Sequence, residues 1–131
     1  MSARNATPNK IKVLLADDSH VMRKAICQHL CEDPEIELIA EARSYSEMLD
    51  MARELKPRVI VLDAHMIDTQ VQRGTAKTLT AVSRIIAISA SSDEETKILA
   101  DSVGALVLLD KMDLYYNLIP AIKQLTGSSA A

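Results

Sequence analysis

The chain has 131 residues, of which 48% are hydrophobic, with no Phe or Trp and a formal net charge of -3. This length indicates one domain with an aliphatic core, and a negative net charge without clustered Lys and Arg argues against direct binding to nucleic acid. No apolar run reaches the roughly 18 to 20 residues of a membrane span, and the N-terminus does not resemble a signal peptide, so we expect a cytoplasmic protein that contacts no membrane.

Short apolar runs alternate along the chain with segments of helical periodicity, which is typical of α/β domains built on a parallel sheet. Residues 1–9 are expected to form a flexible leader, because two Asn and one Pro interrupt any periodicity there. Residues 10–126 should form the folded domain. Residues 127–131, Gly-Ser-Ser-Ala-Ala, have the composition of a linker and are expected to form a tail.

The first half of the domain contains two expected helices between three strands rich in Val, Ile and Leu. One helix begins near Ser19 and ends before Pro34. The next opens with the capping-box pair Ser44 and Glu47, and Lys56-Pro57 stops it. The strands are expected at residues 11–16, 37–42 and 59–62.

Cys27 and Cys31 lie four residues apart in the first expected helix, a spacing that places both thiols on one helix face. Two such thiols would make half of a metal site. The chain has no second cysteine pair, however, and only His29 lies nearby in the sequence. We therefore expect two partly buried, reduced thiols.

The second half of the domain begins with its least clear segment, residues 69–83, where a glycine and several Thr and Ser residues weaken any helical pattern. We expect a short helix there, followed by a strand at residues 85–88. Ser92 and Glu95 then form a second capping box, and Gly104 should end the helix that they begin.

The last strand is expected at residues 106–109, and the helix that follows it has to accommodate Pro120. If Asn117 is the N-cap, the proline occupies the third helical position, where its missing N–H would have no intrahelical partner. The alternative is an earlier start at Asp113 with a kink at the proline. The sequence leaves both starts open.

Polar side chains stand at the carboxyl ends of four expected strands, namely Asp17 with Asp18, Asp63, Ser89 and Lys111. In open α/β sheets, ligands bind just beyond the carboxyl ends of the strands, so these side chains are expected to meet there. Crowded carboxylates repel one another by about 1 to 4 kcal/mol per pair. Such a cluster therefore favours a divalent cation or a protonated member.

The segments around these side chains resemble the receiver domain of bacterial two-component response regulators, over roughly residues 10–126. The resemblance implies an α/β fold of the flavodoxin-like, doubly wound kind: a five-stranded parallel sheet in the order 2-1-3-4-5 with helices on both faces. It rests on four pieces in the same order along the chain, at residues 13–19, 56–63, 86–90 and 104–111.

The resemblance also implies a function. Asp63 would accept a phosphoryl group from a sensor histidine kinase or a phosphotransfer protein, so the domain would act as a signalling switch and not as an enzyme with a separate substrate. Mg²⁺ would be bound by Asp18, Asp63 and the backbone carbonyl of His65. Asp17 would assist from outside the ligand sphere or through water.

The same resemblance assigns roles to the remaining side chains of the cluster. Lys111 would neutralise charge on the phosphoryl group, and Ser89 would donate a hydrogen bond to it and report phosphorylation by moving inward. His65 would either lie near the phosphoryl group and affect its lifetime or simply be exposed. Leu108 replaces an aromatic residue that is common in the family, and we expect it to lie largely inward in both states.

Departures from the family pattern keep an alternative open. The loop after Asp63 lacks a proline near Met66, so the chain could be a receiver-like interaction module that signals without phosphorylation. A phosphohydrolase is disfavoured, because no second acid stands two residues after Asp63 to act as acid or base. By analogy, an effector domain outside this chain would follow the C-terminal end.

Overall fold

One parallel sheet organises the molecule, which is described here by a computed structural model covering residues 10–70 and 79–127. Its strand order, β2-β1-β3-β4-β5, confirms the predicted flavodoxin-like fold. The strands are β1 (Ile11–Ala16), β2 (Ile36–Ala42), β3 (Val59–Asp63), β4 (Arg84–Ser89) and β5 (Val107–Asp110).

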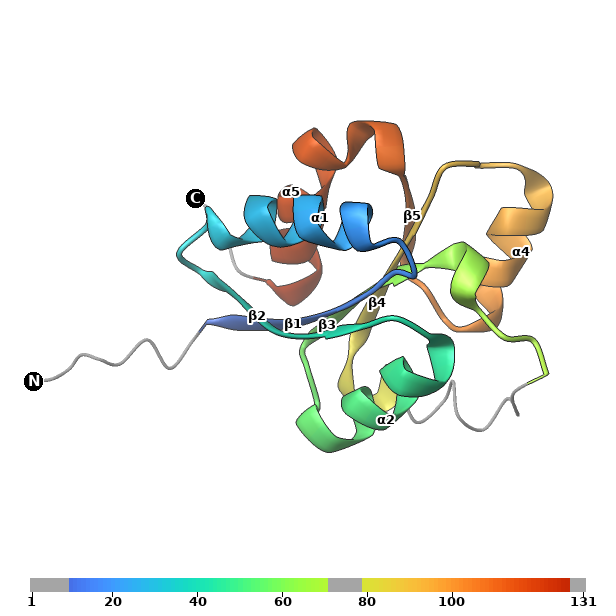
Figure 1. Ribbon diagram of the computed structural model, residues 1–131, viewed down its shortest axis with the longest axis horizontal. Coiled ribbons are helices and arrows are strands. Elements are labelled where there is room, and N and C mark those ends of the chain that lie inside the picture. Colours follow the sequence, from blue (N-terminus) through green and yellow to red (C-terminus); the bar gives the residue numbers. More distant parts are fainter. Residues whose placement is uncertain (1–9, 71–78, 128–131) are drawn as a thin grey trace, which may run out of the picture.

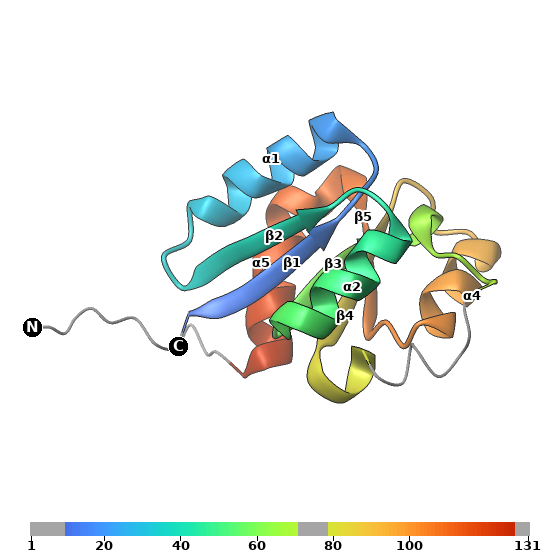
Figure 2. The ribbon, with the colours of Figure 1, turned by 60° about the horizontal axis from the view of Figure 1, so that its bottom comes forward.

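Helices cover both faces of the sheet, with α1 and α5 on one face and α2 and α4 on the other (Figures 1 and 2). Two short 3-10 helices, η1 and η2, directly follow β3 and β5. The bounds are α1 (His20–Cys31), α2 (Tyr45–Leu55), η1 (Ala64–Met66), α4 (Glu94–Ser102), η2 (Lys111–Asp113) and α5 (Leu114–Thr126). No helix in the described residues is long and apolar enough to cross a membrane.

The core consists of two aliphatic layers, one on each face of the sheet. Alternate residues of a strand point to opposite faces, so Val13 and Leu15 of β1 pack toward α1 and α5 while Leu14 and Ala16 pack toward α2. Burial on both faces explains the unbroken apolar runs. Each fully buried Leu, Ile or Val contributes about 1.5 to 3 kcal/mol.

The first two helices begin as the sequence predicts. Ser19 is the N-cap of α1, its Oγ accepting from the Met22 N–H at 3.2 Å. Ser44 caps α2 by accepting from the Glu47 N–H at 3.1 Å, although the Glu47 carboxylate accepts from the N–H of Arg43 and not from that of the cap residue. A left-handed Lys56, with φ of 49°, ends α2.

The capping box predicted at Ser92 and Glu95 is wrong. Asp93 is the N-cap of α4, and its Oδ1 accepts from both the N–H and the hydroxyl of Thr96, at 2.9 and 2.7 Å. A carboxylate that takes two donors beside the positive end of a helix is a stronger cap than a serine hydroxyl. These hydrogen bonds lower the pKa of Asp93. Gly104, with φ of +79°, follows the helix end, as predicted.

Helix α5 takes the early start. It begins at Leu114, directly after η2, and Pro120 lies inside it. The proline has no N–H to donate to the carbonyl of Tyr116, a loss that the late start would avoid. Leu114 and Leu118 are buried in the layer under α5, and their burial offsets the missing hydrogen bond.

Several predicted boundaries move by one residue or lie outside the described part. Strands β3 and β4 extend through Asp63 and Ser89, so both side chains belong to the sheet and not to the loops after it. Residues 79–82 are helical, while residues 71–78 of the predicted third helix lie outside the described residues. The leader 1–9 and the tail beyond Gly127 also lie outside them.

Candidate functional site at the carboxyl edge of the sheet

Lys111 connects three strand ends. Its Nζ lies 2.9 Å from Oδ2 of Asp17 and 3.4 Å from Oδ2 of Asp63. Asp17 follows β1, Asp63 ends β3, and Lys111 opens η2 directly after β5. β1 and β3 are adjacent in the sheet, and β4 separates β3 from β5, so the parallel order brings residues distant in sequence to the same strand ends.

Asp17, Asp18 and Asp63 form a cluster in which one oxygen from each carboxylate lies within 4.8 Å of the others. Asp17 and Asp63 are buried, whereas Asp18 is exposed. The Lys111 ammonium pairs with the two buried acids, Asp17 and Asp63. An oxygen-rich, negatively charged cluster with one exposed member fits a hard divalent cation that keeps several water ligands, such as Mg²⁺.

The surroundings of Asp17 differ from those of the other two acids. Its N–H donates to the carbonyl of Ala42 on β2, and its Oδ1 accepts from the N–H of Ser19 at 2.8 Å. Its Oδ2 is buried and makes no regular hydrogen bond with any described group, although the Lys111 Nζ is within ion-pair distance. Oδ1 is thus occupied by a hydrogen bond, whereas Oδ2 is held only by the charge of Lys111.

Burial and neighbouring charges have opposite effects on the pKa values of Asp63 and Lys111. Burial raises the pKa of Asp63 above its ordinary value, even though the N–H of His65 and the Lys111 ammonium favour the carboxylate. Burial alone would lower the pKa of Lys111, but the two carboxylates outweigh it, so the net shift is upward. Lys111 therefore stays charged, and a further cation beside Asp63 would favour its carboxylate form and so lower its raised pKa.

Arg23 is a site residue that the sequence analysis missed. Its side chain is 9% exposed, its Nη1 donates to the backbone carbonyl of Asp17 at 2.7 Å, and its Nε lies 3.5 Å from Glu41 on β2. The available signal was a charged residue three positions before Ile26 on the buried stripe of α1. The guanidinium fixes the backbone from which the two acids project.

Ser89 is held by groups other than the acids. Its Oγ accepts from the N–H of Ser91 at 3.0 Å and lies 3.2 Å from Nε2 of His65. His65 also donates its backbone N–H to Oδ1 of Asp63 at 3.0 Å. His65 is exposed, as one of the two alternatives had it, and yet its ring reaches the strand-four hydroxyl.

Leu108 is half-buried on β5, opposite Ala87 of β4. Its neighbours Val107 and Leu109 pack into the layer under α1 and α5, so strand alternation directs Leu108 to the face covered by α4. The expectation that it lies largely inward is met only in part.

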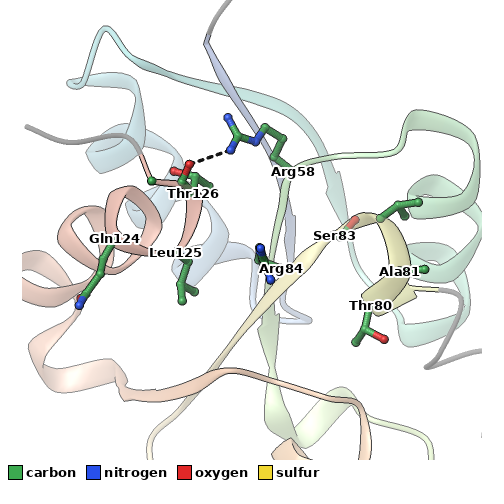
Figure 3. Close-up of a pocket in the computed structure, with 10 residues that line it drawn as sticks. Arg58, Thr80, Ala81, Ser83, Arg84, Gln124, Leu125 and Thr126 are labelled. Atoms are coloured by element: carbon green, nitrogen blue, oxygen red, sulfur yellow. Dashed lines mark hydrogen bonds between the residues drawn. The ribbon is translucent and has the colours of Figure 1, made fainter.

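A cavity of about 590 Å³ lies at the amino ends of β3 and β4, opposite to the carboxyl ends where the acids lie (Figure 3). Arg58 and Arg84, at the starts of β3 and β4, line it together with the end of α5, and Arg58 Nη2 donates to the Thr126 carbonyl at 2.8 Å. The acids and Lys111 are at the opposite strand ends. This cavity is therefore separate from the cluster of acids.

Comparisons with known proteins agree with this geometry. Residues 13–122 match the family model of the response regulator receiver domain. A curated protein-glutamate methylesterase/protein-glutamine glutaminase of Anaeromyxobacter dehalogenans is 33% identical over 102 residues, covering 77% of this chain and 30% of that protein. Its counterpart in Carboxydothermus hydrogenoformans is 50% identical over 58 residues, covering 44% and 16%. The chain thus spans less than a third of these relatives.

Solved structures share the fold. The signal receiver domain of NarL from Mycobacterium tuberculosis superposes with a TM-score of 0.79 at 21% identity, covering 93% of this chain and all of that one. The response regulator domain of Thermotoga maritima CheB gives a TM-score of 0.75 at 24% identity, covering 90% and 97%.

Proposed function

The chain belongs to the response regulator receiver domain family, and on that premise we propose that it is a signalling switch whose phosphoacceptor is Asp63. The observation that carries this proposal is the position of the Lys111 ammonium, 2.9 Å from Asp17 and 3.4 Å from Asp63, beside the exposed carboxylate of Asp18. A nucleophile, a fixed cation and a cluster suited to a metal are what phosphoryl transfer requires.

Of the two carboxylate oxygens of Asp63, Oδ2 is the better nucleophile. Oδ1 accepts the His65 N–H at 3.0 Å, whereas Oδ2 has only the long contact to Lys111. In the proposed step, Oδ2 forms a bond to the phosphorus of a phosphohistidine while the P–N bond breaks. The electron pair of the P–N bond returns to the imidazole nitrogen of the donor. Lys111 stabilises the negative charge on the transferred group.

Asp18, Asp63 and the backbone carbonyl of His65 would hold Mg²⁺, with Asp17 contacting it through water. The ion supplies positive charge against the crowded acids and the phosphoryl oxygens. Asp18 is suited to this role because it is exposed and lies within 4.8 Å of the other two acids. Arg23 holds the Asp17 carbonyl and so fixes the loop that presents Asp18.

The switch we propose is the hydroxyl of Ser89. In the unphosphorylated chain it is occupied by the His65 ring and the Ser91 N–H. To donate to a phosphoryl oxygen, the Ser89 hydroxyl has to leave His65. The contact between Ser89 and His65 therefore opposes the inward movement of the hydroxyl. His65 would then act on both the switch and the lifetime of the acyl phosphate.

The proposal also covers the domain, its partners and its location. Residues 10–126 would be the receiver, without catalytic turnover of a separate substrate, acting in the cytoplasm on phosphoryl groups from a sensor histidine kinase or a phosphotransfer protein. Its output would pass to an effector, either joined at the C-terminal end or separate. The curated relatives carry methylesterase names, so a methylesterase-type effector domain is the first candidate to test.

A small acyl phosphate with Mg²⁺ tests the phosphoacceptor directly. We expect one added phosphoryl group in the intact mass of the chain and none in Asp63→Asn, because an amide is not a competent nucleophile. Asp68→Asn is the matched control, since Asp68 is an exposed acid in the same loop. Equal labelling of Asp63→Asn would contradict the assignment, and no labelling of any chain would favour the interaction module.

A further inference from the structure

The two cysteines on α1 are placed to act together. Cys27 and Cys31 are the only cysteines of the chain, both are free thiols, and their sulfurs lie 4.0 Å apart. Cys27 and Cys31 each follow one of the buried residues Ile26 and Leu30 by one position, so the pair flanks the buried stripe of α1, a helix that lies on the outside of the molecule (Figure 1). Cys31 is exposed and Cys27 is half-buried, so a small molecule in solvent can reach the pair.

The distance between the two sulfurs suits a single atom that bridges them better than it suits a disulfide bond. Residues four apart on a helix have Cβ atoms about 5 to 6 Å apart, whereas a disulfide requires about 3.5 to 4.5 Å. Two thiolates on one tetrahedral zinc, with bonds of about 2.3 Å, lie about 3.8 Å apart. The observed 4.0 Å is close to that value.

The neighbouring groups define which acceptors suit this pair. His29 does not add a third ligand, because its ring stacks on Tyr115 of α5 with centroids 4.6 Å apart. Burial, the second thiol and the nearby Glu41 all raise the pKa of Cys27, so this thiol is protonated at neutral pH. An acceptor that takes up thiols and releases water is favoured over one that requires two free thiolates.

We propose that Cys27 and Cys31 form a two-sulfur chelating site for thiophilic acceptors that bind both sulfurs at one atom, with trivalent organoarsenicals as the representative class. Each thiol replaces one hydroxyl on arsenic: an As–S bond forms, an As–O bond breaks, and the hydroxyl leaves with the thiol proton as water. Arsenic stays trivalent, so no oxidant or reductant is consumed. The site is independent of the phosphorylation chemistry.

Phenylarsine oxide, followed by competition with excess glutathione, tests the chelate on the full chain. We expect one arsenical per chain in the intact mass, retained at glutathione concentrations about 10² to 10⁴ times those that strip a single-thiol adduct, because the second sulfur binds intramolecularly. Cys27→Ser and Cys31→Ser supply the single-thiol reference.

A second variant keeps two thiols on the same helix face but separates them. Lys24→Cys combined with Cys27→Ser places thiols at positions 24 and 31, about 10 Å apart along the axis, and Lys24 is exposed. This variant should lose the arsenical as easily as the single-thiol chains. Equal retention by the wild type and this variant, or two arsenicals on the wild type, would overturn the proposal.

Discussion

At the scale of single residues, the ammonium of Lys111 lies between the two buried acids of the cluster, Asp17 and Asp63. It pairs with two buried carboxylates at once, so it partly does the work that a metal would do there. A cation that enters the cluster therefore competes with its charge. A phosphoryl group on Asp63, as proposed above, would by contrast be attracted by it, so we expect this one side chain to have opposite effects on metal binding and on phosphorylation.

Lys111→Met separates these two effects. We expect Mg²⁺ to bind about as tightly as in the wild type or several-fold more tightly, since one nearby positive charge is worth about 1 kcal/mol or more at such distances. Acyl-phosphate labelling should become slower. Titration calorimetry and intact mass measure the two quantities, with Asp18→Asn as the contrast that weakens Mg²⁺ binding. Unchanged Mg²⁺ affinity in Asp18→Asn would remove Asp18 from the metal site.

Arg23 allows a sharper test of how the acids are held. Arg23→Met leaves the Asp17 carbonyl without its buried donor, which costs about 1 to 3 kcal/mol, and it also frees the loop that carries Asp18. We expect a lower urea midpoint together with weaker Mg²⁺ binding. Glu41→Gln, which removes only the 3.5 Å ion pair, should change neither by much. A stability loss in Arg23→Met with normal Mg²⁺ affinity would make its role purely structural.

At the scale of elements, the sequence predicted what depends on local pattern and failed where patterns overlap. The strand runs, the cap at Ser19 and the glycine after α4 were all recognisable from neighbouring residues. Asp93 was missed because Ser92, one position earlier, has the acid Glu95 three residues later and so completes the capping-box pattern. The start of α5 depended on burying Leu114 against distant strands, and the contacts of Arg23 and His65 depend on how a helix and a loop sit on the sheet.

Among the described residues, Gly104 and Gly127 have positive φ and give a matched pair for testing the junctions between elements. Gly104 (φ +79°) and Gly127 (φ +70°) both follow helices, and alanine at either costs about 1 to 2 kcal/mol for the left-handed backbone. A Cβ on Gly104 would also lie 2.6 Å from Cγ2 of Thr80, whereas one on Gly127 meets nothing within 4 Å. Urea unfolding should show Gly104→Ala to be the more destabilised; equal losses would rule out the steric contribution.

At the scale of the whole molecule, Lys123 near the end of α5 connects the last helix to the segment that follows the first helix, α1. Its Nζ lies 2.8 Å from Asp33 and 3.0 Å from Glu35, in the connection between α1 and β2. Burial would raise the pKa of Asp33, but Lys123 and the Glu35 N–H outweigh it and hold that pKa below its ordinary value.

This ion pair predicts a pH dependence of stability. Because the folded pKa of Asp33 is below its unfolded value, its contribution is complete above that unfolded value, about 3.9, and disappears as the pH falls through the folded pKa. Lys123→Met should therefore lower the melting temperature at neutral pH, and the difference should vanish in strong acid. Lys97→Met, at an exposed position, is the control; a difference that persists in strong acid would contradict the assignment.

Pro120 divides α5 into two parts that need not unfold and refold together. The missing hydrogen bond to the Tyr116 carbonyl interrupts the ladder between the first turns and the last, so the helix is a less cooperative unit than its length implies. The last turns are anchored by Lys123, whereas the first turn directly continues η2 and Lys111. If Lys111 shifts toward a phosphoryl group on Asp63, as the proposed function requires, we expect the first turns of α5 to absorb the shift, and these turns display Tyr115 and Tyr116 to solvent.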